Sequence, residues 1–215
     1  GFDAAASYLP RANTVTVGTP VRANFQAAMP ATPLALAIPE GVPLILIVGG
    51  SQGAVAVNQL IRQAAPDWLG AGAWIVHQTG SNDPDADSFS HPHYIHRPFF
   101  NQMAPLLHRA TLAIGRAGAG TLTELAITAT PSFLIPYPYA ADNHQAFNAR
   151  VFVDAGAALM ADQTSLTAEA LRQKVLHLLE TPHQLQQMSA AAAHLAVRDS
   201  ATQFADLVQK QLMAG

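Results

Sequence analysis

Short apolar segments alternate with longer amphipathic ones along most of this chain, and this alternation restricts the possible fold more than any other feature. Runs rich in aliphatic residues predict strands at 44–48, 73–77, near 93–96, and at 111–114, 132–135 and 157–160. The intervening and following segments predict helices at 54–65, 101–108, 121–129, 143–154, 167–180, 183–195 and 199–212. Strands that alternate with helices form parallel sheets, because the chain returns through a helix packed on one face. The predicted fold class is therefore α/β, an open parallel sheet with helices on both faces.

The composition indicates a compact domain that binds a small molecule. Of the 215 residues, 50% are hydrophobic and 12% are charged, against roughly 25% charged residues in an average globular protein. The apolar runs are far shorter than the ~20 residues that span a bilayer, so we expect neither a membrane span nor a signal peptide. The lack of cysteine excludes disulfides and thiolate chemistry. A net charge of −3 argues against nucleic acid as a partner, since nucleic-acid-binding surfaces are usually basic.

A glycine-rich turn at 49–53 follows the first predicted strand and leads into a helix. Its sequence, GGSQG, fits the nucleophile elbow of hydrolases, in which Ser51 would attack a carbonyl. It also fits a turn whose backbone N–H groups bind a phosphate at a helix N-terminus. A hydrolase needs an acid and a histidine on separate loops, but Asp142 and His144 are nearly adjacent in the chain. The phosphate interpretation is therefore favoured.

A second glycine-rich turn, GRAGAG at 115–120, also lies between a strand and a helix. Neither turn has the G-x-G-x-x-G order of a dinucleotide-binding fingerprint, which argues against NAD. Two such corners in one sheet would direct two helix N-termini at a single crevice, an arrangement that suits a ligand with two phosphates. Glu124 lies one turn into the helix, where a carboxylate could accept hydrogen bonds from ribose hydroxyls. Tight packing of the glycines and a favourable first-turn charge are the alternative interpretation.

Polar residues also follow the fifth predicted strand. The Asp-Asn pair at 142–143 is expected to cap the next helix, and His144, Gln145 and Asn148 lie on its first turns. Amide side chains both donate and accept hydrogen bonds, which suits the hydroxyls of a sugar. A helix that starts with polar residues is often only solvated, so this pattern favours a sugar site only in combination with the others.

Three further residues are candidates on chemical grounds. Arg22 carries a guanidinium fork that matches a phosphate, although isolated surface arginines are common. Phe99 and Phe100 could flank a flat base, although packing in the core is the more frequent role of adjacent aromatic residues.

Two segments resemble metal sites. DPDAD at 83–87 has the spacing with which some nucleotide-sugar enzymes hold a divalent cation, but it lies in a polar loop and is interpreted as a solvated turn. In the extended segment HPHYIH at 91–96, His91 and His93 face one way and His96 faces the other. We therefore expect no metal site and no cofactor.

Taken in order, the segments GTPVR, GGSQGA, HQTG, RPFFNQM, GRAGAGTLTE and PxPxxxDNHQxxNA resemble the motifs of the MurG family. Members of this family are bacterial glycosyltransferases that transfer N-acetylglucosamine from UDP-N-acetylglucosamine to lipid I, an undecaprenyl-pyrophosphoryl-muramoyl-pentapeptide. The resemblance extends from about residue 14 to the C-terminus. It implies one half of a GT-B fold, in which two Rossmann-like domains face each other across a cleft.

This chain resembles the C-terminal, donor-binding domain of the family. Residues 26–215 would form that domain, and residues 1–25 would be the tail of a missing N-terminal acceptor domain together with the interdomain linker. The proline-punctuated sequence before Leu44 agrees with such a lead-in. The catalytic base is expected in the missing domain, so no catalytic residue is assigned, and the chain is expected to be inactive alone.

Motif by motif, the resemblance implies contacts with each part of the donor. The diphosphate would be bound by Arg22, Ser51, Gln52, Gly53, Gly120 and Thr121. Uracil would contact Phe99 and the backbone of Phe100, ribose would contact Glu124, and the N-acetylglucosamine hydroxyls would contact His144 and Gln145. The chain departs from common family residues at two positions, where His144 replaces a frequent glutamine and Ala117 a frequent serine.

The implied reaction is an inverting transfer to the C4 hydroxyl of the muramoyl sugar, which gives lipid II for peptidoglycan. UDP-N-acetylglucosamine and lipid I would be the partners, and the enzyme would lie peripherally on the cytoplasmic face of the bacterial inner membrane. Two alternatives stay open: a nucleotide-sugar-binding module without chemistry, and another GT-B enzyme such as a UDP-N-acetylglucosamine 2-epimerase.

Overall fold

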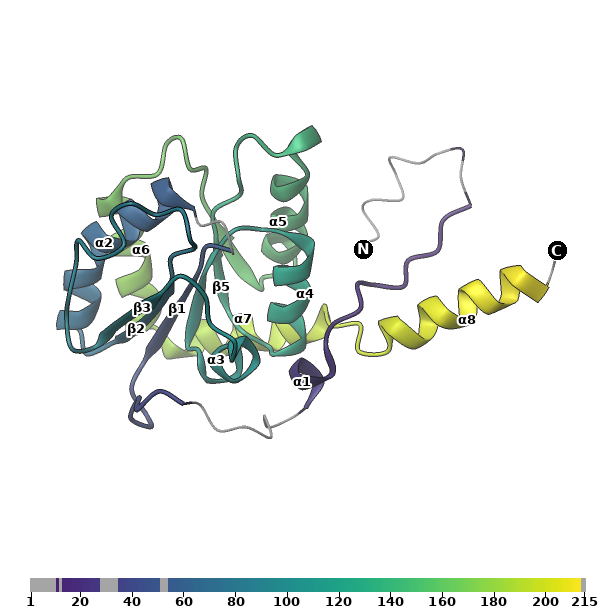
Figure 1. Ribbon diagram of the computed structural model, residues 1–215, viewed down its shortest axis with the longest axis horizontal. Coiled ribbons are helices and arrows are strands. Elements are labelled where there is room, and N and C mark those ends of the chain that lie inside the picture. The colour runs from purple at the N-terminus through teal and green to yellow at the C-terminus, as the bar shows by residue number, and fades with distance from the viewer. Residues whose placement is uncertain (1–10, 12, 28–34, 51–53, 214–215) are drawn as a thin grey trace.

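The computed structural model describes residues 11, 13–27, 35–50 and 54–213, and within them the chain forms one six-stranded parallel sheet (Figure 1). The strands are β1 (Leu44–Val48), β2 (Trp74–Gln78), β3 (Tyr94–Arg97), β4 (Leu112–Gly115), β5 (Ser132–Leu134) and β6 (Ala158–Met160). They lie in the order β3-β2-β1-β4-β5-β6, and every pair of neighbours is parallel. The predicted α/β fold class is confirmed.

Helices cover both faces of this sheet. The helical elements are α1 (Ala23–Gln26), α2 (Val55–Gly70), α3 (Met103–Arg109), α4 (Ala119–Ile127), η2 (Ala141–Asn143), α5 (His144–Asp154), α6 (Ala168–Glu180), α7 (Pro182–His194) and α8 (Ser200–Met213). On one face α2 packs against α6, while α3, α4 and α5 lie on the other (Figure 1). α7 contacts both α4 and α6, and α8 projects away from the body of the protein (Figure 1). In the described part of the chain, no helix combines the length and the apolar character that crossing a membrane requires.

The core has two halves, one on each face of the sheet, and β1 contributes to both. Leu44, Leu46 and Val48 belong to the cluster on the side of α3, α4 and α5, whereas Ile45 and Ile47 belong to the cluster on the side of α2 and α6. Successive side chains of a strand point to opposite faces, so a strand covered on both faces must be apolar throughout. All of β1 is buried, and each such aliphatic side chain stabilises the fold by about 1.5–3 kcal/mol.

The strands and helices agree with the predicted ones to within about two residues at each end, with two differences. The helix predicted to end at Ala65 continues through Pro66 to Gly70 as part of α2. The extra turn buries Trp68, whose indole N–H donates to the carbonyl of Arg172 on α6 at 3.2 Å. Burial of this side chain therefore offsets the ~3 kcal/mol cost of an internal proline. The short α1 is not predicted, because a single turn carries no periodic pattern.

Candidate functional site

The candidate site lies at the carboxyl edge of the sheet, between the loops that follow β1 and β4. These strands are neighbours in the sheet, but the chain leaves them in opposite directions, towards β2 and β5 respectively. The loops therefore diverge and leave a crevice, which is where open α/β sheets bind their ligands. The predicted site residues Ser51, Gln52 and Gly53 belong to the first loop and lie outside the described residues.

Gly115 and Gly49 allow the strand ends to approach closely at this edge. A Cβ added at Gly115 would lie 2.5 Å from the carbonyl O of Val48, and one added at Gly49 would lie 3.0 Å from the carbonyl O of Gln78. In both cases the obstacle is backbone, which cannot move aside as a flexible side chain can. The packing interpretation of the second turn therefore applies to Gly115, and the same close approach is found at Gly49.

Gly118 and Gly120 differ, because a Cβ added at either would meet no atom of the described residues within 4 Å. Gly118 is the N-cap of α4 and offers no side chain to accept from the first N–H groups of the helix. The N–H of Leu122 donates to the Gly118 carbonyl at 3.0 Å, and the N–H groups before it have no partner within the helix. Gly120 is exposed and Thr121 is partly exposed, so within the described part of the chain nothing covers the positive end of the α4 dipole.

Arg22 and Glu124, predicted as separate ligand contacts, form an ion pair. Arg22 Nη2 lies 3.3 Å from Glu124 Oε1, and the Arg22 side chain is 66% exposed whereas that of Glu124 is 23% exposed. Arg22 is held there by its neighbour Phe25, which is fully buried and whose ring centroid lies 5.0 Å from the guanidinium carbon. Burial raises the pKa of the Glu124 carboxyl, and the charge of Arg22 reduces this shift without cancelling it.

The predicted sugar contacts Gln145 and His144 begin α5, beside the loop after β4. Gln145 Oε1 accepts hydrogen bonds from the N–H of Ala117 at 3.3 Å and from the N–H of Tyr137 at 3.0 Å. His144 is exposed, and its Nδ1 lies 2.8 Å from the Ala141 carbonyl, so this nitrogen carries the proton. These bonds involve His144 Nδ1 and Gln145 Oε1, so His144 Nε2 and the amide nitrogen of Gln145 are the remaining polar atoms of the two side chains.

Two details of this segment correct or extend the sequence prediction. Asn143 occupies the N-cap position of α5, but it makes no side-chain cap hydrogen bond and adopts a left-handed conformation with φ 54°. The prediction of Asp142 or Asn143 as N-cap is therefore confirmed in position by Asn143, but the expected side-chain cap hydrogen bond is not formed. Asn148 Nδ2 donates to the Ala117 carbonyl at 3.3 Å. Two side chains of α5, Gln145 and Asn148, therefore bind the backbone N–H and the carbonyl of Ala117.

Arg116 is a site residue that the sequence prediction missed. Its guanidinium donates to the carbonyls of Ile135 at 3.0 Å and Pro136 at 3.1 Å, and to Gln163 Oε1 at 2.5 Å. It thereby joins the loops that follow β4, β5 and β6. Burial lowers the pKa of Arg116. Its guanidinium carbon lies 5.4 Å from the ring centroid of Tyr137. An arginine placed between glycines directly after a strand is the signal that could have identified it.

The two predicted base contacts, Phe99 and Phe100, follow β3 and have opposite environments. Phe99 is 56% exposed and Phe100 is 5% exposed. The backbone N–H of Phe100 donates to Gln78 Oε1 at 3.1 Å, within the protein. A cavity of about 220 Å³ adjoins both rings and is also lined by Arg97 and Gln102.

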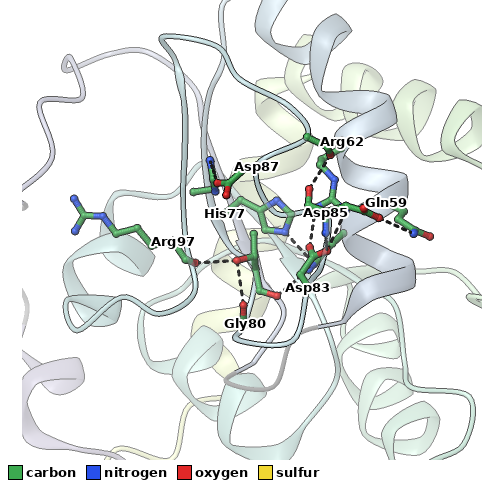
Figure 2. A network of polar contacts seen from close by, with 12 residues as sticks. Gln59, Arg62, His77, Gly80, Asp83, Asp85, Asp87 and Arg97 are labelled. Carbon is green, nitrogen blue, oxygen red and sulfur yellow. Dashed lines mark hydrogen bonds and ion pairs between the residues drawn. The ribbon is translucent and has the colours of Figure 1, made fainter.

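The acidic loop at 83–87 is not simply solvated, which corrects the sequence interpretation. Asp83 has a fully buried side chain that accepts hydrogen bonds from Arg62 Nη1 and Asn58 Nδ2, both at 2.7 Å. Figure 2 shows this carboxylate enclosed between α2 and the loop. Burial alone would raise the pKa of Asp83, but the hydrogen bonds from Arg62 and Asn58 outweigh it and lower the pKa. Asp87 fits the prediction, because its side chain is 97% exposed.

Histidines do not combine with these acids into a metal site. Among the described residues, no group of three or more His, Cys, Asp or Glu side chains is placed to hold a metal ion. His77 is buried between Tyr94 Oη at 2.6 Å and Asn58 Oδ1 at 3.0 Å. Burial, assisted by the charge of Arg62, lowers the pKa of His77 to about 3. This histidine is therefore neutral and structural.

A wider cavity of about 580 Å³ lies at the opposite edge of the sheet. It is lined by residues that precede β4 and β5 and by α7, including Thr111, Pro131 and Ser189. Because open parallel sheets bind ligands outside the carboxyl ends of their strands, this cavity is not the candidate site.

Comparison with known proteins identifies the family to which this domain belongs. Residues 44–208 match the glycosyltransferase family 28 C-terminal domain. The chain is 60% identical over 208 residues to the UDP-N-acetylglucosamine-N-acetylmuramyl-(pentapeptide) pyrophosphoryl-undecaprenol N-acetylglucosamine transferase of Rippkaea orientalis, a match that covers 97% of this chain and 58% of that protein. The protein of the same name from Trichormus variabilis is 59% identical over 98% of this chain and 59% of its own length.

A solved structure of a MurG protein is also similar to this chain. The crystal structure of Acinetobacter baumannii MurG superposes with a TM-score of 0.71 at 32% sequence identity, over 80% of this chain and 51% of that one. The chain thus spans less than two thirds of the length of these relatives. The resemblance to the MurG family is confirmed, and the family match includes all six strands of the sheet and the loops that form the crevice. This chain belongs to the family of glycosyltransferase family 28 C-terminal domains.

Proposed function

We propose that the chain is the donor-binding half of an inverting glycosyltransferase that transfers N-acetylglucosamine from UDP-N-acetylglucosamine to the C4 hydroxyl of the muramoyl sugar of lipid I. The product would be lipid II, a precursor of peptidoglycan. The observation that carries the proposal is the N-terminus of α4, which no side chain of the described residues caps and which lies beside the crevice between β1 and β4. The names of the two relatives, both N-acetylglucosamine transferases, supply the substrate class.

The diphosphate of the donor would lie at the N-terminus of α4. Backbone N–H groups of Gly120 and Thr121 would donate to it, and Arg22 would add a positive charge from the lead-in segment. Ser51, Gln52 and Gly53 would contribute from the turn after β1. Negative charge grows on the leaving diphosphate during transfer, and donors that are already in place stabilise it without reorganisation.

The nucleoside would extend along the crevice from this point. Glu124 would accept hydrogen bonds from the ribose hydroxyls, which requires it to exchange its present contact with Arg22, 3.3 Å away. The freed Arg22 would then pair with the diphosphate. Uracil would contact the backbone of Phe100, with the exposed ring of Phe99 covering the base.

The sugar would lie against the start of α5. A hydroxyl there could donate to His144 Nε2 and accept from the amide nitrogen of Gln145, neither of which is used by the hydrogen bonds to Ala141, Ala117 and Tyr137. Arg116 would support the sugar site without contacting the ligand. Its hydrogen bonds join the loop after β4 to the loop after β5 and so fix their relative positions.

The rest of the enzyme is part of the same proposal. Residues 1–25 would be the tail of an acceptor domain and the linker, and residues 26–215 the donor domain. The catalytic base and the binding surface for lipid I would belong to the acceptor domain. Because undecaprenol is a membrane lipid, the full enzyme would lie peripherally on the cytoplasmic face of the bacterial inner membrane.

Calorimetric titration of this chain with UDP-N-acetylglucosamine, UDP, UDP-glucose and NAD tests the proposal. Saturable binding of UDP and UDP-N-acetylglucosamine, with none of NAD, is the expected result. Binding of NAD in preference to UDP would contradict it. Turnover of UDP-N-acetylglucosamine with lipid I by a chain of the full length of the relatives, and its absence with this chain alone, would separate the transferase from a binding module.

A further inference from the structure

Gln78, the last residue of β2, connects the two ends of the crevice. It is 3% exposed and lies at the carboxyl edge of the sheet. Its backbone carbonyl accepts from the N–H of Gly49, where the turn after β1 begins, at 3.3 Å. Its side-chain Oε1 accepts from the N–H of Phe100, in the loop after β3, at 3.1 Å. One buried residue thus bonds to the phosphate side and to the base side of the proposed donor site.

The residues on either side of Gln78 are fixed by the network in Figure 2. His77 is bonded to Tyr94 and Asn58, and the backbone carbonyl of Thr79 accepts from Asn58 Nδ2 at 2.8 Å. Side chains alternate along a strand, so the His77 side chain faces α2 while that of Gln78 points to the opposite face, where Phe100 lies. Hydrogen bonds on both sides of Gln78 therefore fix the end of β2, and from this position the Gln78 side chain contacts the loop after β3.

The bond to Gln78 determines which backbone group of Phe100 can contact a base. The Phe100 N–H is used within the protein, so the group that remains for a ligand is the carbonyl, which can only accept. Uracil carries a hydrogen on N3 and can donate to such a carbonyl. The N3 of cytosine carries no hydrogen and would place two acceptors against each other.

We propose, on the basis of the donor site described above, that Gln78 is a positioning residue for base recognition. It holds the peptide before Phe100 so that the Phe100 carbonyl accepts from uracil N3–H, and in this way it gives the site its preference for uracil over cytosine. Polar groups built to pair with one partner discriminate strongly against an analogue that leaves them unpaired.

Calorimetric titration of the 215-residue chain with UDP, CDP and inorganic pyrophosphate provides the test. The wild-type chain is expected to bind CDP at least about tenfold more weakly than UDP, since one hydrogen bond is lost and one acceptor is left unpaired. Gln78→Met keeps the length of the side chain but removes the acceptor. It should weaken UDP binding by about tenfold and change pyrophosphate binding by less than about twofold, because only the base side loses its anchor.

Two further variants complete the set. Gln78→Glu should restore most of the UDP affinity, since a carboxyl oxygen accepts from the Phe100 N–H whether or not the group is protonated. Gln59→Met, on the exposed face of α2 where Gln59 Nε2 lies 3.4 Å from Asp85 Oδ2, should bind all three ligands like the wild type.

The possible results separate this role from a general structural one. Unchanged UDP binding by Gln78→Met, or an equal loss of UDP and pyrophosphate, would overturn the proposal, as would equal affinity of the wild type for UDP and CDP. If Gln78→Met fails to fold, the ratio of UDP to CDP affinity in the wild type and in Gln78→Glu decides the question. A wild-type chain that binds none of the nucleotides would contradict the proposed function itself.

Discussion

Two polar clusters lie at the same edge of the sheet, and they differ in whether their hydrogen bonds close within the protein. Beside β2, Arg62, Asp83 and His77 are buried and bonded to one another or to their neighbours. Beside β4, no side chain of the described residues caps the helix end, and Arg22 and Glu124 form a partly exposed ion pair. A closed cluster fixes a loop, whereas an open one can exchange its contacts for a ligand. Both clusters are polar, but only the one beside β4 has hydrogen-bonding groups that can be given to a ligand. This difference distinguishes the proposed ligand site from the structural cluster.

The closed cluster should have the largest effect on stability. Asp83→Ala leaves Arg62 buried without its partner, and removal of one member of a buried ion pair costs roughly 3–5 kcal/mol. Urea denaturation followed by circular dichroism measures the loss. Asp87→Ala, in the same loop but 97% exposed, is the matched control and should change the free energy of unfolding by less than about 0.5 kcal/mol. Similar effects of the two substitutions would mean that the cluster is solvated.

The difference between the clusters also shows what the sequence can predict. The sheet follows largely from local patterns, since most strands are short apolar runs next to turn residues, whereas β3 (YIHR) is only half apolar, and the glycine-rich turns mark the crevice. The burial of Asp83 could not be predicted, because its partner Arg62 lies 21 positions earlier on a helix. Arg22 and Glu124 are separated by 102 positions in the sequence. Each residue could be identified from the sequence as a candidate ligand contact, but the ion pair between them could not.

On the open side, the largest expected effect is on ligand binding. Arg22→Ala removes a charged donor to the diphosphate and should weaken UDP binding by roughly 1.5–3 kcal/mol. Stability should change little, because the Arg22 side chain is 66% exposed and exposed ion pairs contribute about 0–1 kcal/mol. Lys174→Ala, an exposed position on α6, is the charge-matched control for calorimetric titration with UDP. Equal affinities of the two variants would argue that Arg22 has no contact with the donor.

Glu124 offers a test that depends on pH. Its pKa in the folded protein is raised above the ordinary value of 4.5, so the folded state takes up the proton more readily than the unfolded state. The charged carboxylate therefore costs stability at neutral pH, and Glu124→Gln should be slightly more stable there. As the pH falls through the folded pKa towards 4.5, the wild type should regain this difference.

The same variant should bind UDP about tenfold more weakly at neutral pH, because an amide is a poorer acceptor for the ribose hydroxyls than a carboxylate. Glu180→Gln, exposed at the end of α6, serves as the control for both measurements. A stability difference between Glu124→Gln and wild type that is independent of pH would contradict the raised pKa. Undiminished UDP binding would remove Glu124 from the proposed site.

A small gain in stability is also expected at the N-terminus of α4. Gly120→Ala replaces glycine in the first turn of α4, where an added Cβ meets no atom of the described residues, so the free energy of unfolding should rise by about 0.5–1 kcal/mol. Binding of UDP-N-acetylglucosamine should weaken nevertheless, because the methyl group would occupy space that the proposal gives to the diphosphate. Gly70→Ala, at the end of α2 and equally open, should change stability without changing binding. If Gly120→Ala gains stability and keeps full affinity, the open space above α4 does not hold the donor, and the glycine there has no role that the ligand explains.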